Sequence, residues 1–179
     1  MSFDPMLFLW GGAETLSLPR QTALIFFILT LPLCLWTAIS DLRHMLIRNN
    51  AVIALAAVFA VVGIFLMPLP VYGWQLAQLV IVLLVGIVMN ALGLLGAGDA
   101  KFAASAAPYV VLTDVRFLVL LFALILLGAV AAHRLARVTP LRNLAPEWKS
   151  WGRKKDFPMG LALGPTLSAY LGLSALYGS

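Results

Sequence analysis

The sequence predicts an all-α fold, a polytopic membrane bundle of about six transmembrane helices. Hydrophobic residues make up 63% of the chain, charged residues only 11%, and the mean hydropathy is +1.01; these values do not suit a water-soluble domain. Apolar runs recur at the length of roughly 20 residues that crosses a hydrocarbon core, and they are too continuous for alternating barrel strands. The 179 residues fit one membrane-embedded domain, residues 1–179.

The N-terminal residues 1–20 are interpreted as an interfacial lead-in. No Lys or Arg precedes Arg20, so a cleavable signal with a basic start is not expected. The first span is predicted over residues 21–40, where a membrane helix tolerates Pro32 with a kink. The polar stretch 41–50 ends it.

The second and third spans are separated by a clear turn signal. The second is expected over residues 51–67 and ends at residues 68–73, which are rich in Pro and Gly. The third is expected over residues 74–95, with Trp74 suited to anchor it at the membrane interface.

The fourth segment, residues 100–113, is short for a crossing. It covers only about 20 Å at 1.5 Å per residue, so Asp99 at its start is expected slightly below the membrane surface. A fifth span is predicted over residues 117–132 and a sixth over residues 159–177.

The loop between the last two spans, residues 133–158, holds more than half of the basic residues and predicts the topology. They are Arg134, Arg137, Arg142, Lys149, Arg153, Lys154 and Lys155. By the positive-inside rule this loop faces the cytoplasm. Counting crossings back places both termini on the outer, periplasmic side. The turns at 41–50 and 96–101 then face the cytoplasm.

Two of the seven acidic residues, Asp41 and Asp99, stand at the edges of apolar segments and reach the same face in this topology. A carboxylate beside a membrane is costly unless something uses or pairs it. Two adjacent carboxylates share a proton, so that one activates water while the other donates to a carbonyl oxygen. Peptide hydrolysis is the best-known use of such a pair, and it requires no metal or cofactor.

Structural alternatives exist for each aspartate. Asp99 follows a Gly and is a good N-cap for the fourth helix, whereas Asp41 can end the first span and pair with Arg43 or Arg48. Taken together with the flanking residues and the shared face, the pair favours the catalytic interpretation.

The residues around Asp99 fit a substrate-binding site. Gly96 and Gly98 permit close backbone approach, and Lys101 either places positive charge near the pair or snorkels to the cytoplasmic surface. Asn90, about two helical turns before Gly96, is a candidate for hydrogen bonding within the bundle near the site.

Other residues argue against metal or nucleic-acid binding. The single cysteine, Cys34, excludes a CxxC cluster and is interpreted as a buried apolar residue. His44 and His133 lie in separate loops without metal-ligand spacing. The net charge of +5 is assigned to loops that orient the bundle and meet anionic lipid, with the bilayer and not nucleic acid as partner.

With these residues the chain resembles the bacterial type IV prepilin leader peptidases, the Gly-x-Gly-Asp membrane aspartyl proteases. It is similar in particular to the short form associated with Flp-type, tight-adherence pili. The family motif Gly-x-Gly-Asp-x-Lys is complete as Gly96, Gly98, Asp99 and Lys101.

Two further stretches carry the resemblance. A family motif of Asp followed at fixed spacing by Ile-Pro-Asn is matched by Asp41, Ile47 and Asn49, with Arg48 in place of the Pro. Near the C-terminus, Pro158, Gly160 and Gly164 match a family pattern that leads into the last helix. The spacing of these two glycines also predicts close helix packing.

The resemblance implies an aspartic-type endopeptidase of the bacterial inner membrane, with Asp41 and Asp99 as catalytic residues facing the cytoplasm. Its expected substrate is a prepilin, a Flp-type pilin or pseudopilin precursor. Long-form relatives carry paired CxxC motifs and also N-methylate the new terminus, so peptidase activity without methyltransferase activity is expected here. The alternatives from other classes are a proton- or cation-coupled transporter subunit and a noncatalytic assembly protein.

Overall fold

A computed structural model of the protein describes residues 16–153 and 156–179. Most of the predicted lead-in, up to residue 15, lies outside these residues. The described part is all-α, as predicted, and contains six α-helices and four short 3-10 helices. The α-helices are α2 (Arg20–His44), α3 (Asn49–Leu66), α4 (Leu69–Ala91), α5 (Ala97–Ala106), α6 (Val115–Val138) and α7 (Gly160–Tyr177).

Within the described residues, four segments are long and apolar enough to cross a membrane. They are Arg20–His44, Asn49–Leu66, Leu69–Ala91 and Leu112–Val138. The predicted fourth segment is even shorter as an α-helix than expected, because α5 has 10 residues and gives way to two 3-10 turns, η1 (Ala107–Tyr109) and η2 (Leu112–Asp114). Helix α7 has 18 residues and contains Pro165.

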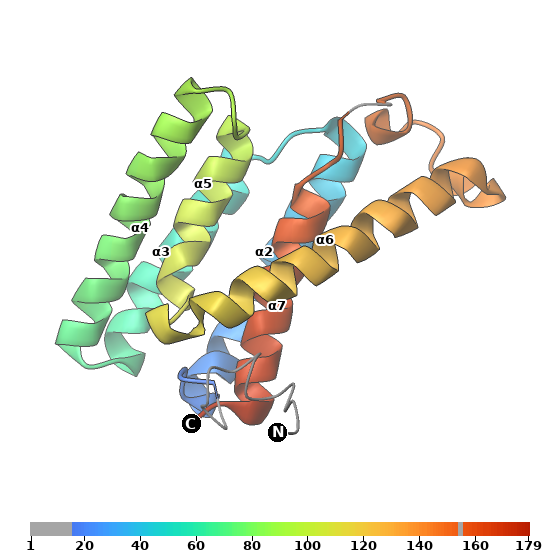
Figure 1. Ribbon diagram of the computed structural model, residues 1–179. Helices are drawn as coiled ribbons and strands as arrows, with labels where there is room; N and C mark the ends of the chain where they lie inside the picture. Colours follow the sequence, from blue (N-terminus) through green and yellow to red (C-terminus); the bar gives the residue numbers. More distant parts are fainter. Residues whose placement is uncertain (1–15, 154–155) are drawn as a thin grey trace, which may run out of the picture.

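The helices form two groups joined by an oblique helix (Figure 1). Helices α3, α4 and α5 lie together on one side, α2 and α7 pair on the other, and α6 crosses α7 at a steep angle. An aromatic cluster connects the groups, with the Phe26 ring centroid 5.6 Å from that of Phe59 and 4.9 Å from that of Tyr109. All three side chains are fully buried.

Helices α2 and α7 approach closely because glycines face α2. A Cβ on Gly164 would lie 2.6 Å from the Cys34 carbonyl oxygen, and one on Gly160 would lie 2.9 Å from the Asp41 Cβ. Small residues at this spacing allow backbones to pack directly against each other. The close packing predicted from these two glycines is confirmed.

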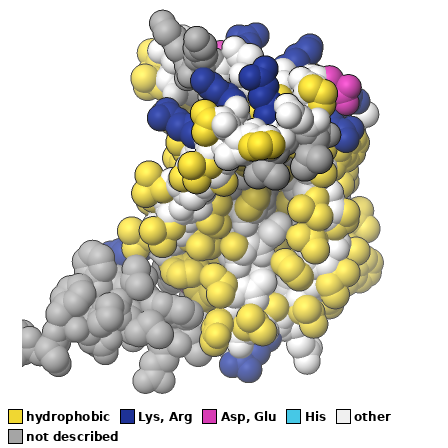
Figure 2. Space-filling model, turned by 90° about the vertical axis from the view of Figure 1, so that its right-hand side faces the viewer, with side chains coloured by type: hydrophobic (Ala, Val, Ile, Leu, Met, Phe, Trp, Pro, Cys, Tyr) yellow, Lys and Arg dark blue, Asp and Glu magenta, His cyan; other side chains and the backbone are white. Residues whose placement is uncertain are grey.

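One end of the bundle collects three connections, and we call it the basic end. It comprises the α2–α3 loop at residues 45–48, the α4–α5 turn at 92–96 and the α6–α7 connection at 139–159 (Figure 1). Figure 2 shows Lys and Arg side chains gathered chiefly at this end, above a surface dominated by hydrophobic side chains. The three connections predicted to share one side of the membrane therefore lie at one end of the molecule.

At the opposite end of the bundle, a buried carboxylate, Asp114, accepts hydrogen bonds from two other segments of the chain. Asp114 is 5% exposed and accepts hydrogen bonds from the Tyr170 hydroxyl at 2.8 Å and from the Ser17 backbone N–H at 3.1 Å. A β-bridge between Leu16 and Gly178 joins the two ends of the described chain beside it. This network fixes the α5–α6 connection against α7.

Candidate active site

Asp41 lies in the last turn of α2 and is held from the first residue of α7. Its side chain is 6% exposed, and its Oδ2 accepts a hydrogen bond of 2.6 Å from the Gly160 backbone N–H. The first N–H groups of a helix have no partner within that helix and carry partial positive charge. The start of α7 therefore supplies a fixed donor to this carboxylate.

Asp99 lies in the first turn of α5, half-buried, and folds back over the residue that precedes the helix. A Cβ on Gly96 would lie 2.6 Å from Asp99 Oδ2. Gly96 has an ordinary extended backbone with φ −64° and ψ 142°. The requirement for glycine is therefore one of space, as the sequence analysis proposed.

Gly98 brings the start of α5 against the loop that follows Asp41. A Cβ on Gly98 would lie 3.2 Å from the Ile47 Cβ, and Ile47 is buried. The loop itself is held by Ser40, whose hydroxyl donates to the Leu46 carbonyl oxygen at 3.0 Å. Residues from the two predicted motifs thus pack directly on each other.

Lys101 and Asn49 form a second link between the motifs. The Lys101 ammonium donates a hydrogen bond of 3.2 Å to the Asn49 side-chain oxygen, at an exposed position. The link ties the first turn of α3 to α5. Lys101 therefore reaches outward to Asn49, and both predicted residues border the site at its surface.

Asn90 does not point into the bundle as expected. It is exposed in the last turn of α4, and its side-chain N–H donates to the Leu95 carbonyl oxygen at 2.8 Å. Its own carbonyl accepts from the Gly93 N–H, where a φ of +72° requires a glycine. Asn90 therefore shapes the turn that presents Gly96, and the prediction of a bond within the bundle was wrong.

Asp41 and Asp99 come together although 58 residues separate them. The contact of Gly98 with Ile47 and the hydrogen bond from Lys101 to Asn49 bring the start of α5 against the loop that begins four residues after Asp41. Like charges at short range share a proton and titrate as one unit. The arrangement has the chemical capacity of a two-carboxylate acid and base.

The structural alternatives for the two aspartates find no support. Within residues 16–153 and 156–179 the one salt bridge joins Arg153 to Asp156 at 3.1 Å, so Asp41 forms none with Arg43 or Arg48. The N-cap of α5 is Gly96, and no side chain bonds to this helix end. The interpretation of Asp99 as an N-cap was wrong.

Arg48, which stands where the prepilin peptidase pattern has Pro, has a proline-like backbone. It is the N-cap of α3 with φ −75° and ψ 134°, and proline fixes φ near −65°. The loop therefore has the backbone shape that proline would favour, without proline at that position.

A protein-family model describing the type IV leader peptidase family matches residues 17–133, about two thirds of the chain. The chain belongs to the type IV leader peptidase family. Its members are aspartic-type prepilin peptidases, and the matched residues include both candidate aspartates. Searches of curated proteins and of solved structures return no significant match.

The family match ends in α6, before the donor to Asp41. The sequence pattern predicts a packing role for Gly160 and does not identify its N–H as the partner of a site carboxylate. The position of this glycine at the start of a helix was the available signal. No group of three His, Cys, Asp or Glu side chains arranged to hold a metal occurs in the described residues of this peptidase.

Proposed function

We propose that the protein removes the leader peptide from type IV prepilins at the cytoplasmic membrane face, with Asp41 and Asp99 as the catalytic pair. The observation that carries the proposal is that the last turn of α2, which contains Asp41, and the first turn of α5, which contains Asp99, both lie at the basic end although they are far apart in sequence. Membership of the leader peptidase family supplies the substrate class.

In the proposed mechanism one carboxylate takes a proton from a water molecule as that water attacks the scissile carbonyl. The other, protonated, donates to the carbonyl oxygen as negative charge develops there. Gly160 keeps one oxygen of Asp41 occupied and oriented, so the other oxygen remains for water. The pair exchanges its proton as a unit, and acid and base are not divided between the residues.

The cytoplasmic orientation is inferred from charge. The α6–α7 connection carries Arg142, Lys149 and Arg153, and Arg137 lies in the last turn of α6 just before it. Membrane proteins retain such basic segments in the cytoplasm. The turns that carry Asp99 and follow Asp41 lie at the same end (Figure 1). Both described chain ends then face the periplasm.

We also propose a Flp-type precursor as substrate and no methyl transfer by this chain. The motif pattern resembles the short family form, and the 179 residues contain one cysteine, Cys34, buried in α2. Mass spectrometry of the processed pilin tests this. The N-terminus should carry no methyl group when this protein is the sole processing enzyme present, and an added methyl group would contradict the proposal.

The catalytic proposal is tested with Asp41→Asn and Asp99→Asn in cells that co-express a prepilin. Each variant should accumulate in the membrane and leave the precursor uncleaved. Asp156→Asn, at an exposed acidic residue, should process normally. Shortening of the precursor at near wild-type rate by either dyad variant would refute the proposed pair.

A transporter function is less well supported. Ion-binding carboxylates of transporters usually lie near the bilayer midplane, whereas both aspartates lie at helix ends. Family membership also argues for a peptidase.

A further inference from the structure

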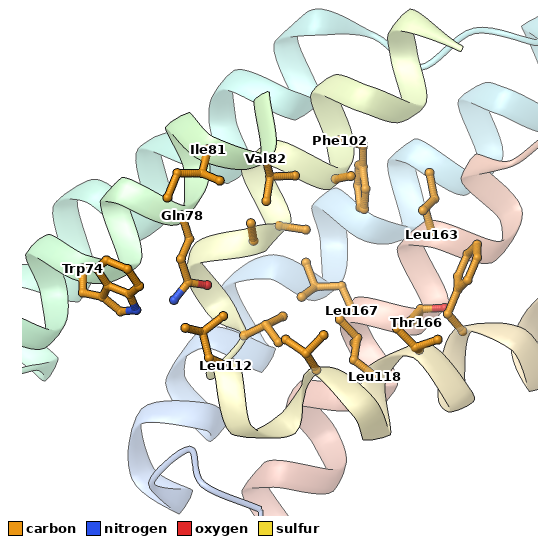
Figure 3. Close-up of a pocket in the computed structure, with 17 residues that line it drawn as sticks. Trp74, Gln78, Ile81, Val82, Phe102, Leu112, Leu118, Leu163, Thr166 and Leu167 are labelled. Carbon is orange, nitrogen blue, oxygen red and sulfur yellow. The ribbon is translucent and has the colours of Figure 1, made fainter. Parts of the chain in front are cut away.

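An apolar groove runs between α4, α5, α6 and α7 (Figure 3). Its volume is about 500 Å³, and all four helices contribute side chains to its walls. Small residues of α5, Ala103 and Ala106, line it together with Leu118 of α6 and Leu163 of α7. The mechanism proposed above makes no use of this groove.

The groove and the candidate active site share two helices, α5 and α7. Ala103 follows Asp99 by four residues on α5, and Leu163 follows Gly160 by three residues on α7. Residues three or four apart lie on the same face of a helix. Lining residues of the groove therefore lie about one helical turn from Asp99 and from the donor to Asp41.

The far end of the groove contains a buried polar group. The amide of Gln78 on α4 points into the groove near Trp74 (Figure 3). Gln78 is 8% exposed, and its side chain forms no hydrogen bond within the described residues. An amide in hydrocarbon without a partner is costly. Lipid tails offer no hydrogen-bonding atom, so the lining indicates an occupant that carries one.

The dimensions of the groove match a helix. Gly86 of α4 packs against Ala100, beside Asp99, so Gln78, eight residues earlier, lies about 12 Å below the carboxylates. A helix about 10 Å wide occupies about 900 Å³ over that length. The groove therefore accommodates roughly half of its cross-section, and the other half remains exposed to lipid.

We propose that this groove binds the apolar helical segment of the prepilin. The leader junction then emerges one turn above it, at Asp41 and Asp99, and the amide of Gln78 binds a polar group of the substrate segment about 12 Å farther along. The inference rests on the proposed function, because the substrate class comes from it. Dispersion contacts and one hydrogen bond, the forces that join helices within membranes, hold the segment in place.

Photo-crosslinking tests the location. A photoreactive phenylalanine analogue is placed at Leu118 in the groove or at Ile53, an exposed residue of α3 outside it, in the Asp99→Asn background with a co-expressed prepilin. Position 118 should yield an adduct with the precursor and position 53 should not. An adduct with a second copy of the enzyme, adducts with lipid alone, or equal precursor adducts from both positions would overturn the proposal.

Gln78 provides a second test with a matched control. Gln78→Leu should raise the thermal midpoint in detergent, because it removes an unpaired buried amide, and raise the KM for the full-length precursor several-fold. Gln75 is a buried glutamine on the same helix that does not line the groove. Gln75→Leu should leave KM unchanged. An unchanged KM in Gln78→Leu would overturn the role of Gln78.

The two proposals fail in different ways. If the aspartate variants abolish processing but crosslinks arise from α3, the catalytic pair stands and the groove assignment falls. If the aspartate variants still process the precursor, the proposed function fails whatever the crosslinks show.

Discussion

The Asp99 carboxylate folds over Gly96 so closely that a Cβ at residue 96 would lie 2.6 Å from Asp99 Oδ2. Gly96→Ala should therefore displace the carboxylate. We expect at least a tenfold loss of prepilin processing, about 1.4 kcal/mol in transition-state free energy. The thermal midpoint should change little, because the displaced atom is the free end of a side chain. Processing rate and thermal unfolding in detergent measure the two effects.

Gly93, in the same turn, is the control residue for separating a loss of processing from a loss of stability. Its φ of +72° disfavours any side chain, so Gly93→Ala should lower stability by about 1 kcal/mol and retain more activity than Gly96→Ala. The reverse ranking of activities would contradict the crowding of Asp99 by residue 96.

Gly160→Ala tests whether Asp41 depends on the close packing of α2 against α7. A Cβ there would lie 2.9 Å from Asp41 Cβ and 3.2 Å from the Thr37 carbonyl oxygen, so α2 and α7 must separate. Overpacking of this kind costs about 1–3 kcal/mol, and processing should fall with stability. Gly128→Ala in α6, where nothing lies within 4 Å, is the control and should be neutral or stabilising. Wild-type stability in Gly160→Ala would show that the helices do not pack this closely.

Arg48→Pro should be tolerated. The φ of −75° at this position suits proline, and a compatible proline restricts the unfolded chain, which raises stability by about 0.4–1 kcal/mol. Processing should remain within twofold of wild type. Ile53→Pro, in the interior of α3, should lower stability by about 3 kcal/mol. A comparable loss in Arg48→Pro, measured by thermal unfolding, would mean that the loop depends on the Arg48 N–H.

Tyr170→Phe should lower the stability of the protein and leave its processing activity unchanged. It leaves buried Asp114 without the 2.8 Å hydrogen bond, a loss of about 1–3 kcal/mol. Prepilin processing per folded molecule should not change, since the α5–α6 connection, which contains Asp114, lies at the end of the bundle opposite the basic end (Figure 1). Tyr72→Phe removes an exposed bond to the Ala60 carbonyl and should cost less. Equal losses of stability in Tyr170→Phe and Tyr72→Phe would contradict a larger contribution from the buried hydrogen bond to Asp114.

Loop charge and turn residues sufficed to predict the helices and the shared end of the two aspartates. Apolar runs located the helices but not all of their ends. Helix α4 begins at Leu69, within the turn expected over residues 68–73, and α6 continues to Val138, beyond the expected end at residue 132. Positive charge in the α6–α7 connection grouped three connections at one side, which the fold bears out. Apolar runs, loop charges and Pro or Gly residues are local features, so they can be recognised in a single sequence.

Partners that depend on tertiary packing were not predictable in the same way. The donor to Asp41 is a backbone N–H, which every residue but proline carries, so no side chain revealed it. Asp114 lies between two expected spans, residues 100–113 and 117–132, and its buried hydrogen bond comes from Tyr170, 56 residues away. The direction of Asn90 depends on the turn at Gly93. The relevant distances arise only when helices pack.

The pairing of α2 with α7 also sets an order of events during synthesis. Asp41 and its donor Gly160 are 119 residues apart, so at about 5–20 residues per second the carboxylate precedes its partner by about 6–24 s. Over that interval the ribosome is still making the helices between them, and a carboxylate at a membrane edge is left without its intended contact. If the proposed peptidase needs this donor to orient Asp41, we expect its activity to begin only after α7 has inserted beside α2.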